Sequence, residues 1–120
     1  MINPGVLSVT FRKLSAREIV DLTAQAGLHG IEWGGDVHVP HGDLSAAREV
    51  RRMTEHAGLA VLAYGSYFRC KPNEAFEPVL ASAVALGAPL IRIWAGERGS
   101  DQADDAIRAA VAEHARISAA

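Results

Sequence analysis

The sequence predicts an α/β protein built from four consecutive βα units. Gly27, Gly58 and Gly87 each follow a helical pattern and precede an apolar strand, at spacings of 31 residues (58 − 27) and 29 residues (87 − 58). About thirty residues is the length of one βα unit. The expected strands are apolar nearly throughout, which is typical of parallel strands covered on both faces. We therefore expect parallel strands alternating with helices and joined by right-handed crossovers.

The first unit begins with an expected strand over residues 6–11, "VLSVTF". Ser15 and Glu18 then form a capping box, in which each side chain satisfies a backbone N–H at the start of a helix. Helical periodicity predicts one buried face for that helix. Its expected members are Ile19, Leu22, Thr23 and Ala26.

The other three units follow the same pattern. Their strands are expected over residues 30–33, 60–65 and 90–95. Asp43 is an N-cap residue for the second helix, because its carboxylate can accept a first-turn N–H. Proline is tolerated in a first helical turn, so the third helix begins near Pro78. The fourth helix is expected to start near Ser100 or Asp101, because acidic residues follow there and the helix dipole favours them in the first turns. The second helix is expected to bury Ala46, Val50, Met53 and Ala57.

Composition indicates a single globular domain over residues 1–120. The chain is 49% hydrophobic and carries a net charge of −2, so it offers no basic face for nucleic acid. Its apolar segments are too short to span a membrane, and no signal peptide opens it. One cysteine, Cys70, excludes an internal disulfide framework and suits a reducing compartment. We therefore expect a cytoplasmic protein that binds neither nucleic acid nor membrane.

Four βα units form only half of a closed barrel. A complete (βα)₈ barrel needs eight units and about 250 residues. Three outcomes are open: a truncated product, a homodimer that hides both open strand edges, or an open α/β layer. We favour truncation, because the last helical segment, "EHARISAA", ends without a stop signal.

Ligand sites in parallel α/β proteins lie at the carboxyl ends of the strands. This rule selects Glu32 in an otherwise apolar strand, where a buried carboxylate needs a partner. A substrate-binding or metal-associated role for Glu32 and an ion pair with Arg92 are about equally supported. The loop over residues 34–43 holds His38 and His41, which with nearby aspartates offer Zn²⁺ or Mn²⁺ ligand types. Pro40 between the histidines argues against a shared helical face, so contact with substrate is favoured over metal binding.

Four aromatic residues also lie at strand ends. Aromatic rings can pack on the C–H faces of a sugar. Trp33 should point away from Glu32 and pack in the core, because side chains alternate along a strand. Tyr64 and Trp94 remain candidate substrate residues. Glu97, with Arg98, precedes a helix start where an anion could bind, although this pattern is not specific to phosphate. Tyr67 is the fourth aromatic residue of this group, after Trp33, Tyr64 and Trp94.

Several strand and loop segments of this chain resemble those of a known protein family. The segment from "GVLSVTF" through "GIEWGGDVHVPHGD", together with "EHAGLAVLAYGSYFR" and "ALGAPLIRIWAG", resembles the first half of xylose isomerase-like TIM barrels. This superfamily includes sugar phosphate isomerases and epimerases and the endonuclease IV group. The resemblance covers almost the whole chain, and it implies a (βα)₄ half of a TIM barrel.

The resemblance implies metal-assisted proton transfer next to a carbonyl of a sugar or polyol. In similar complete barrels, a divalent metal (Mn²⁺, Mg²⁺, Co²⁺ or Zn²⁺) is held by Glu, Asp, His and Glu residues of strands five to eight. The four expected strands lack those ligands, so the isolated chain should be inactive without a partner half. Glu32, His38, His41 and Trp94 match pocket-facing positions of the first half. The alternatives are a non-catalytic scaffold and an endonuclease IV-like DNA repair enzyme, which the charge disfavours.

Overall fold

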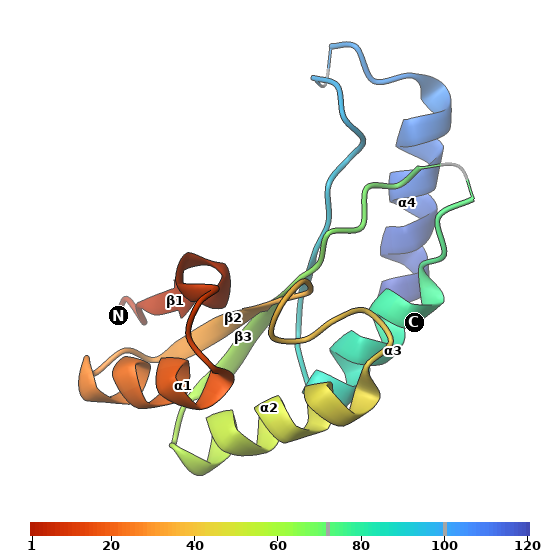
Figure 1. The fold of residues 1–120 in the computed structure, drawn as a ribbon. Helices are drawn as coiled ribbons and strands as arrows, with labels where there is room; N and C mark the ends of the chain where they lie inside the picture. The colour runs from red at the N-terminus through yellow and green to blue at the C-terminus, as the bar shows by residue number, and fades with distance from the viewer. Residues whose placement is uncertain (72, 100) are drawn as a thin grey trace.

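The computed structural model describes residues 1–71, 73–99 and 101–120. It contains one sheet of four parallel strands, which lie side by side in sequence order and alternate with four α-helices (Figure 1). This arrangement confirms the predicted (βα)₄ architecture. The strands are β1 (Gly5–Leu7), β2 (Gly30–Gly34), β3 (Ala60–Gly65) and β4 (Ile91–Arg92). The helices are α1 (Ala16–Gln25), α2 (Leu44–His56), α3 (Glu77–Leu86) and α4 (Asp105–Ala119).

The first and last strands are shorter than the sequence predicts. β1 ends at Leu7, and Ser8–Phe11 form a 3₁₀ helix, η1. The chain turns there because the buried Ser8 hydroxyl accepts a hydrogen bond from the Gly34 N–H at 2.8 Å. β4 ends at Arg92, and the following Trp94 N–H donates to the carbonyl of Phe68. The chain beyond β4 therefore runs beside the loop that follows β3.

Three of the four predicted helix starts are confirmed. The capping box of Ser15 and Glu18 is present, the Asp43 carboxylate accepts the Ala46 N–H, and Pro78 lies in the first turn of α3. The fourth prediction is wrong for Asp101, which lies in a turn, whereas Ser100 lies outside the described residues. α4 begins later because Asp104 is its N-cap residue and accepts the Ile107 N–H.

The buried faces of the first two helices differ by part of a turn from the predicted stripes. α1 buries Val20 together with Ile19 and Thr23, whereas Leu22 is 47% exposed. α2 buries Ala47, Val50 and Thr54. The predicted members Met53 and Ala57 are respectively half-buried and exposed. The sheet and the neighbouring helices decide this rotation, since two overlapping apolar stripes satisfy the same helical period.

The two faces of the sheet have different surroundings. Trp33 of β2 pairs in register with Tyr64 of β3, and both are completely buried on the face that packs against helices. Glu32 and Leu7 are also in register and point to the other face, because side chains alternate along a strand. Leu7 is 45% exposed, so this second face is not covered by the described part of the chain. We call it the open face.

The last helix packs loosely. α4 has no buried residue, and it stands to one side of the sheet in Figure 1. It contacts the core through Val111, Ile117 and His114, whose ring lies 4.8 Å from that of Phe68 and 4.7 Å from that of Phe76. Within the described residues, no helix combines the length and apolar character that a membrane crossing requires.

Candidate functional site

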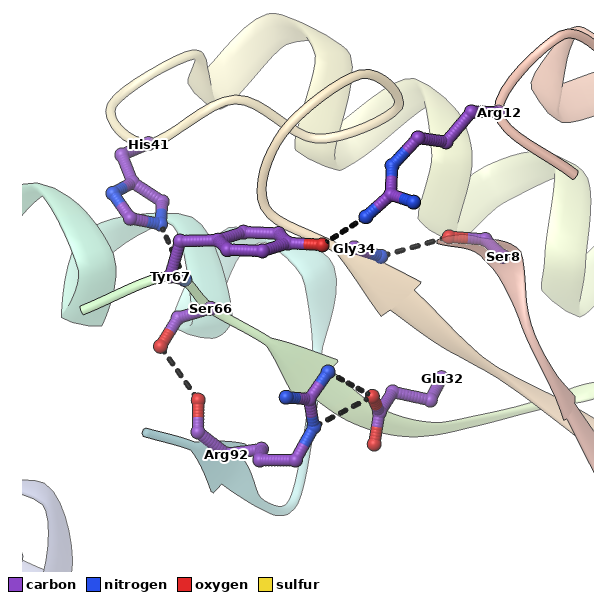
Figure 2. Close-up of polar contacts among 8 residues, drawn as sticks. All are labelled: Ser8, Arg12, Glu32, Gly34, His41, Ser66, Tyr67 and Arg92. Atoms are coloured by element: carbon purple, nitrogen blue, oxygen red, sulfur yellow. Dashed lines mark hydrogen bonds and ion pairs between the residues drawn. The ribbon is translucent and has the colours of Figure 1, made fainter. Parts of the chain in front are cut away.

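An ion pair between Glu32 and Arg92 lies on the open face (Figure 2). Arg92 Nε and Nη2 donate to the same carboxylate oxygen, Glu32 Oε1, at 3.0 Å and 2.8 Å. The predicted ion pair is thus present, and in the described residues the second oxygen, Oε2, accepts no hydrogen bond from the protein. Gly65 makes room for the pair, because a Cβ there would lie 2.6 Å from Oε1 and 2.8 Å from Nη2.

Trp94 extends this ion pair across the open face. Its indole lies 5.8 Å from Arg92 Cζ, within cation–π range, and its side chain is 43% exposed. Arg92 and Glu32 are 36% and 19% exposed, so all three side chains are accessible to a ligand. We call Glu32, Arg92 and Trp94 the polar row. It combines an acceptor from the middle of β2 with a donor at the carboxyl end of β4 and an apolar ring just beyond that end.

A second group joins the loops that follow β1, β2 and β3. Arg12 Nε donates to Asp36 Oδ2 at 2.6 Å. Figure 2 shows the second contact of this guanidinium, in which Arg12 Nη2 donates to the hydroxyl of Tyr67. The Tyr67 backbone N–H in turn donates to His41 Nε2 at 3.3 Å. We call Arg12, Asp36, His41 and Tyr67 the loop cluster. Sequence reasoning missed Arg12; the available signal was a basic residue just beyond the first strand.

The charge on Asp36 is stabilised by this arrangement. Partial burial acts to raise its pKa, but the hydrogen bond from Arg12, the positive charge of Arg12 and the nearby backbone N–H groups of Val37 and Asp36 outweigh it. The pKa of Asp36 is therefore lowered from 3.8, and its carboxylate is ionised at neutral pH. The Arg12–Asp36 pair is a charged connection between two loops rather than a source or acceptor of protons.

The two histidines of the loop over residues 34–43 have opposite tautomers. His41 Nε2 accepts a backbone N–H, so the proton of its neutral ring is on Nδ1. His38 Nε2 lies 2.8 Å from the Leu14 carbonyl, which only accepts, so Nε2 of His38 carries the proton. His38 is buried against Trp33, with which it forms an edge-on aromatic pair. Of these two histidines, only His41 can therefore offer a ring N–H donor at the surface.

These contacts do not form a metal site. A histidine ligand needs a free nitrogen lone pair, and the lone pair of His41 is occupied by the Tyr67 N–H. The free lone pair of His38 belongs to a buried Nδ1, while Asp36 is paired with Arg12 and Asp43 caps α2. No group of three or more His, Cys, Asp or Glu residues that could hold a metal ion occurs in residues 1–71, 73–99 and 101–120. The residues present do not fit a divalent metal.

Two further candidate residues have structural contacts. Tyr64 is inaccessible, and its hydroxyl donates to the Val39 carbonyl at 2.7 Å, so its proposed contact with substrate is corrected to core packing. Burial raises the pKa of Tyr64 to about 12. Glu97 pairs with Lys71 at 2.8 Å and precedes α4 by several residues. Glu97 therefore does not lie in the first turn of a helix.

We expect His41 to make unfolding dependent on pH below about 6.5. Burial lowers the pKa of His41, although the Glu74 carboxylate acts in the opposite direction. As the pH falls through 6.5, the ordinary value, the unfolded chain takes up a proton before the folded chain does. The free energy of unfolding should therefore decrease with falling pH until the lower pKa of the folded state is passed. Urea denaturation of the wild type and His41→Gln between pH 8 and 5 measures this difference.

In that experiment His41→Gln should show a shallower decrease than the wild type. His56→Gln is the matched control, because it removes an exposed imidazole near the end of α2 and tests whether the change in slope is specific to His41. Equal slopes for His41→Gln and the wild type would contradict the interpretation. Nitrogen-15 NMR of the imidazole rings should also show the Nδ1–H tautomer for His41 and the Nε2–H tautomer for His38.

Comparison with known proteins supports the fold. The sequence matches no protein-family model and no curated protein sequence. The structure is similar to that of a xylose isomerase domain-containing protein from Salmonella typhimurium, with a TM-score of 0.74 and 16% identity over 98% of this chain and 45% of that chain. It is also similar to the probable 3-DHS dehydratase AsbF, involved in petrobactin synthesis, from Bacillus anthracis. The TM-score there is 0.70, with 19% identity over 98% of this chain and 47% of that chain.

The chain spans less than half the length of each of these two proteins. At such low identities the similarity establishes the fold alone. The matched architecture is that of four parallel strands alternating with four helices. The fold inferred from the helix–glycine–strand pattern is thereby confirmed: this chain has the fold of about half of a xylose isomerase-like TIM barrel.

Proposed function

We propose that this chain provides the substrate-binding part of a sugar isomerase or epimerase site of the (βα)₈ type. The observation that carries the proposal is the polar row. It runs from the middle of β2 to the carboxyl end of β4, the end of the strands at which α/β barrels bind their ligands, and it lies on the face of the sheet that is open in the described residues. Glu32 and Arg92 supply an acceptor and donors beside the exposed indole of Trp94.

The polar row suits the chemistry of a sugar or polyol. Glu32 Oε2 can accept from a substrate hydroxyl, and the N–H groups of Arg92 that face away from Oε1 can donate to a substrate oxygen. The face of Trp94 can pack on substrate C–H groups. Because Arg92 already holds Glu32, the carboxylate is oriented before substrate arrives, which lowers the entropic cost of binding.

The same residues do not account for the chemical step. An isomerase or epimerase moves a proton next to a carbonyl, which requires a base with access to that carbon. Asp36 is paired with Arg12, the accessible nitrogen of His41 carries a proton, and the free Oε2 of Glu32 is assigned to a substrate hydroxyl. We therefore assign binding and orientation to these four βα units. The groups that move the proton, and any metal that polarises the substrate, belong to the remainder of a complete site.

The test is NMR observation of the two tryptophan indoles during titration with D-fructose, a ketose, and D-glucose, an aldose. The chain has two tryptophans. Trp94 is exposed in the polar row, whereas Trp33 is buried and its Nε1–H donates to Thr54. We expect sugar to shift the Trp94 signal with a Kd on the order of millimolar, because one open face covers only part of a sugar. The Trp33 signal should stay in place and report an intact fold.

Glu32→Ala should abolish the sugar-dependent shift of Trp94, because it removes the acceptor that orients Arg92. Glu49→Ala is the matched control, since Glu49 also pairs with an arginine, Arg52, but on the exposed surface of α2. An unchanged affinity in Glu32→Ala, with the Trp33 signal intact, would refute the role of Glu32. A Trp94 signal that no sugar shifts in the wild type would refute the proposed function.

A further inference from the structure

β4 is an edge strand, and one of its sides is free. The sheet has the order β1-β2-β3-β4, so within the described residues β1 and β4 each have a neighbouring strand on one side only. On the β3 side, the carbonyls of Leu90 and Arg92 accept backbone N–H groups of β3 and of the residue that follows it. Because backbone groups alternate in direction along a strand, those of Ile91 and Ile93 point to the free side.

An apolar groove borders this free side. Two cavities, of ≈ 330 Å³ and ≈ 390 Å³, are lined by residues of the β4 segment and of α4, and both have Val111 in their lining. α4 has no buried residue, so its apolar side chains on this face are only partly covered. We call the two cavities together the β4–α4 groove. Its apolar lining includes Ile91, Ile93, Ala95, Ile107, Val111 and Ala115.

The spacing of these lining residues shows that the groove follows the strand. On the β4 side they recur at every second position, and on the α4 side at every fourth position, so each set lies on one face of its element. An added strand fits such a groove, because its backbone can pair with the free edge of β4 while its alternate side chains fill the apolar space.

β1 has the features that such an added strand needs. It is the other edge strand, and its register places Val6 on the helix-covered face of the sheet and Leu7 on the open face. Ile91 lies on the helix-covered face as well, because it is in register with the buried Tyr64. A parallel pairing of β1 with β4 would therefore direct Val6 to the groove and keep the two open faces on the same side.

The β1 strand that pairs with β4 must come from a second copy of the chain. Within one copy, β2 and β3 separate β1 from β4. The chain has the fold of about half of a TIM barrel, and it spans less than half of each matched protein. A second copy related by a two-fold axis along the barrel would offer its β1 to β4 and its β4 to β1. Both free edges are then paired through one repeated contact.

We propose that the β4–α4 groove is a dimer interface, which binds β1 of a second copy so that two chains form one closed eight-stranded barrel. The polar rows of the two copies then face a common interior, and each copy completes the binding site of the other. This inference goes beyond the proposed function and does not rest on it, since strand edges and apolar surface drive the pairing whatever the site binds.

The test is the mass of the purified chain by size-exclusion chromatography with light scattering, at concentrations across the micromolar range. We expect twice the mass of one chain, with no further growth at high concentration, because the two-fold arrangement leaves no free edge. A monomer throughout this range would overturn the proposal. A mass that keeps rising with concentration would also overturn it, because the chains would then be stacking edge to edge without closing.

Ala115→Glu should weaken the dimer by roughly tenfold or more, because it places a charge in the apolar groove. Ala109→Glu is the matched control: it makes the same change at another exposed position of α4, which lines neither cavity, and should leave the dimer intact. Both side chains are exposed, so circular dichroism should show a native fold for both variants. Equal dimer affinity of the two variants would overturn the groove as the interface.

Ile2→Lys tests the other side of the interface. Ile2 is 90% exposed and precedes β1, so the lysine should weaken the dimer without unfolding the chain. Val84→Lys, at a 68% exposed position of α3, should leave the dimer intact. A monomeric wild type whose Trp94 signal still shifts with sugar would overturn the dimer and leave the proposed function standing. A dimer whose Trp94 signal no sugar shifts would do the reverse.

Discussion

Trp33→Ala is expected to destabilise the protein by about 3–5 kcal/mol, the usual cost of truncating a buried aromatic side chain to alanine. Trp33 is completely buried between the sheet and the helices, and its Nε1–H donates to Thr54 Oγ1 at 3.1 Å. Its removal leaves a cavity and an unused acceptor in the centre of the fold. Because small domains are stable by only about 5–15 kcal/mol, the variant should be close to unfolding at room temperature.

The measurement is urea denaturation followed by far-UV circular dichroism, which does not depend on the deleted indole. Trp94→Ala is the matched control, because the same substitution at a 43% exposed side chain should cost only about 1 kcal/mol. Trp33→Phe should fall between the two, since it keeps a ring but loses the hydrogen bond to Thr54. Equal costs for Trp33→Ala and Trp94→Ala would show that Trp33 does not organise the core.

Gly30→Ala is expected to cost about 3 kcal/mol through overpacking. A Cβ at Gly30 would lie 2.3 Å from the carbonyl oxygen of Ala60 and 2.9 Å from Leu62 Cγ. Ala60 is the register partner of Gly30 in β3. The carbonyl cannot move away without disturbing the ladder between the two central strands. Denaturation of the purified variant measures the loss of stability.

Gly65→Ala is the matched control, because it adds the same methyl group to the neighbouring strand on the open face. There the three atoms nearest to the new Cβ would be Glu32 Oε1, Arg92 Nη2 and Glu32 Cδ, which lie at the ends of flexible side chains. Gly65→Ala should therefore cost much less stability than Gly30→Ala. A Gly30→Ala variant as stable as Gly65→Ala would contradict the close approach of the two central strands at Gly30.

Local sequence signals predicted the succession of elements well. Gly27, Gly58 and Gly87 all have positive φ angles, between 69° and 74°, at the ends of α1, α2 and α3. Glycine adopts this conformation at little cost, so its spacing along the chain marks helix ends without reference to the rest of the fold. The caps at Ser15 and Asp43 are equally local, because each depends on residues within one helical turn.

The composition of the candidate site was predicted less completely. Glu32 and Trp94 were predicted as site residues by one rule, that ligand sites of parallel α/β proteins lie at the carboxyl ends of the strands. Tyr64 was selected by the same rule, yet its register with Trp33 and the shift between Ile31 and Glu32 place it on the buried face. Register describes how two strands some thirty residues apart pair with each other, so the sequence of one strand alone does not predict it.

The sequence by itself determined the α/β class, the order of strands and helices, and the glycine-marked ends of three helices, because these features depend on contacts within a few residues. The tertiary structure decided which overlapping stripe of α1 is buried, where β1 and β4 end, and which charges meet. Arg12 reaches Asp36 across 24 positions, and Arg92 reaches Glu32 across 60. Such pairs form only after the strands have packed side by side, because packing brings distant positions within hydrogen-bonding distance.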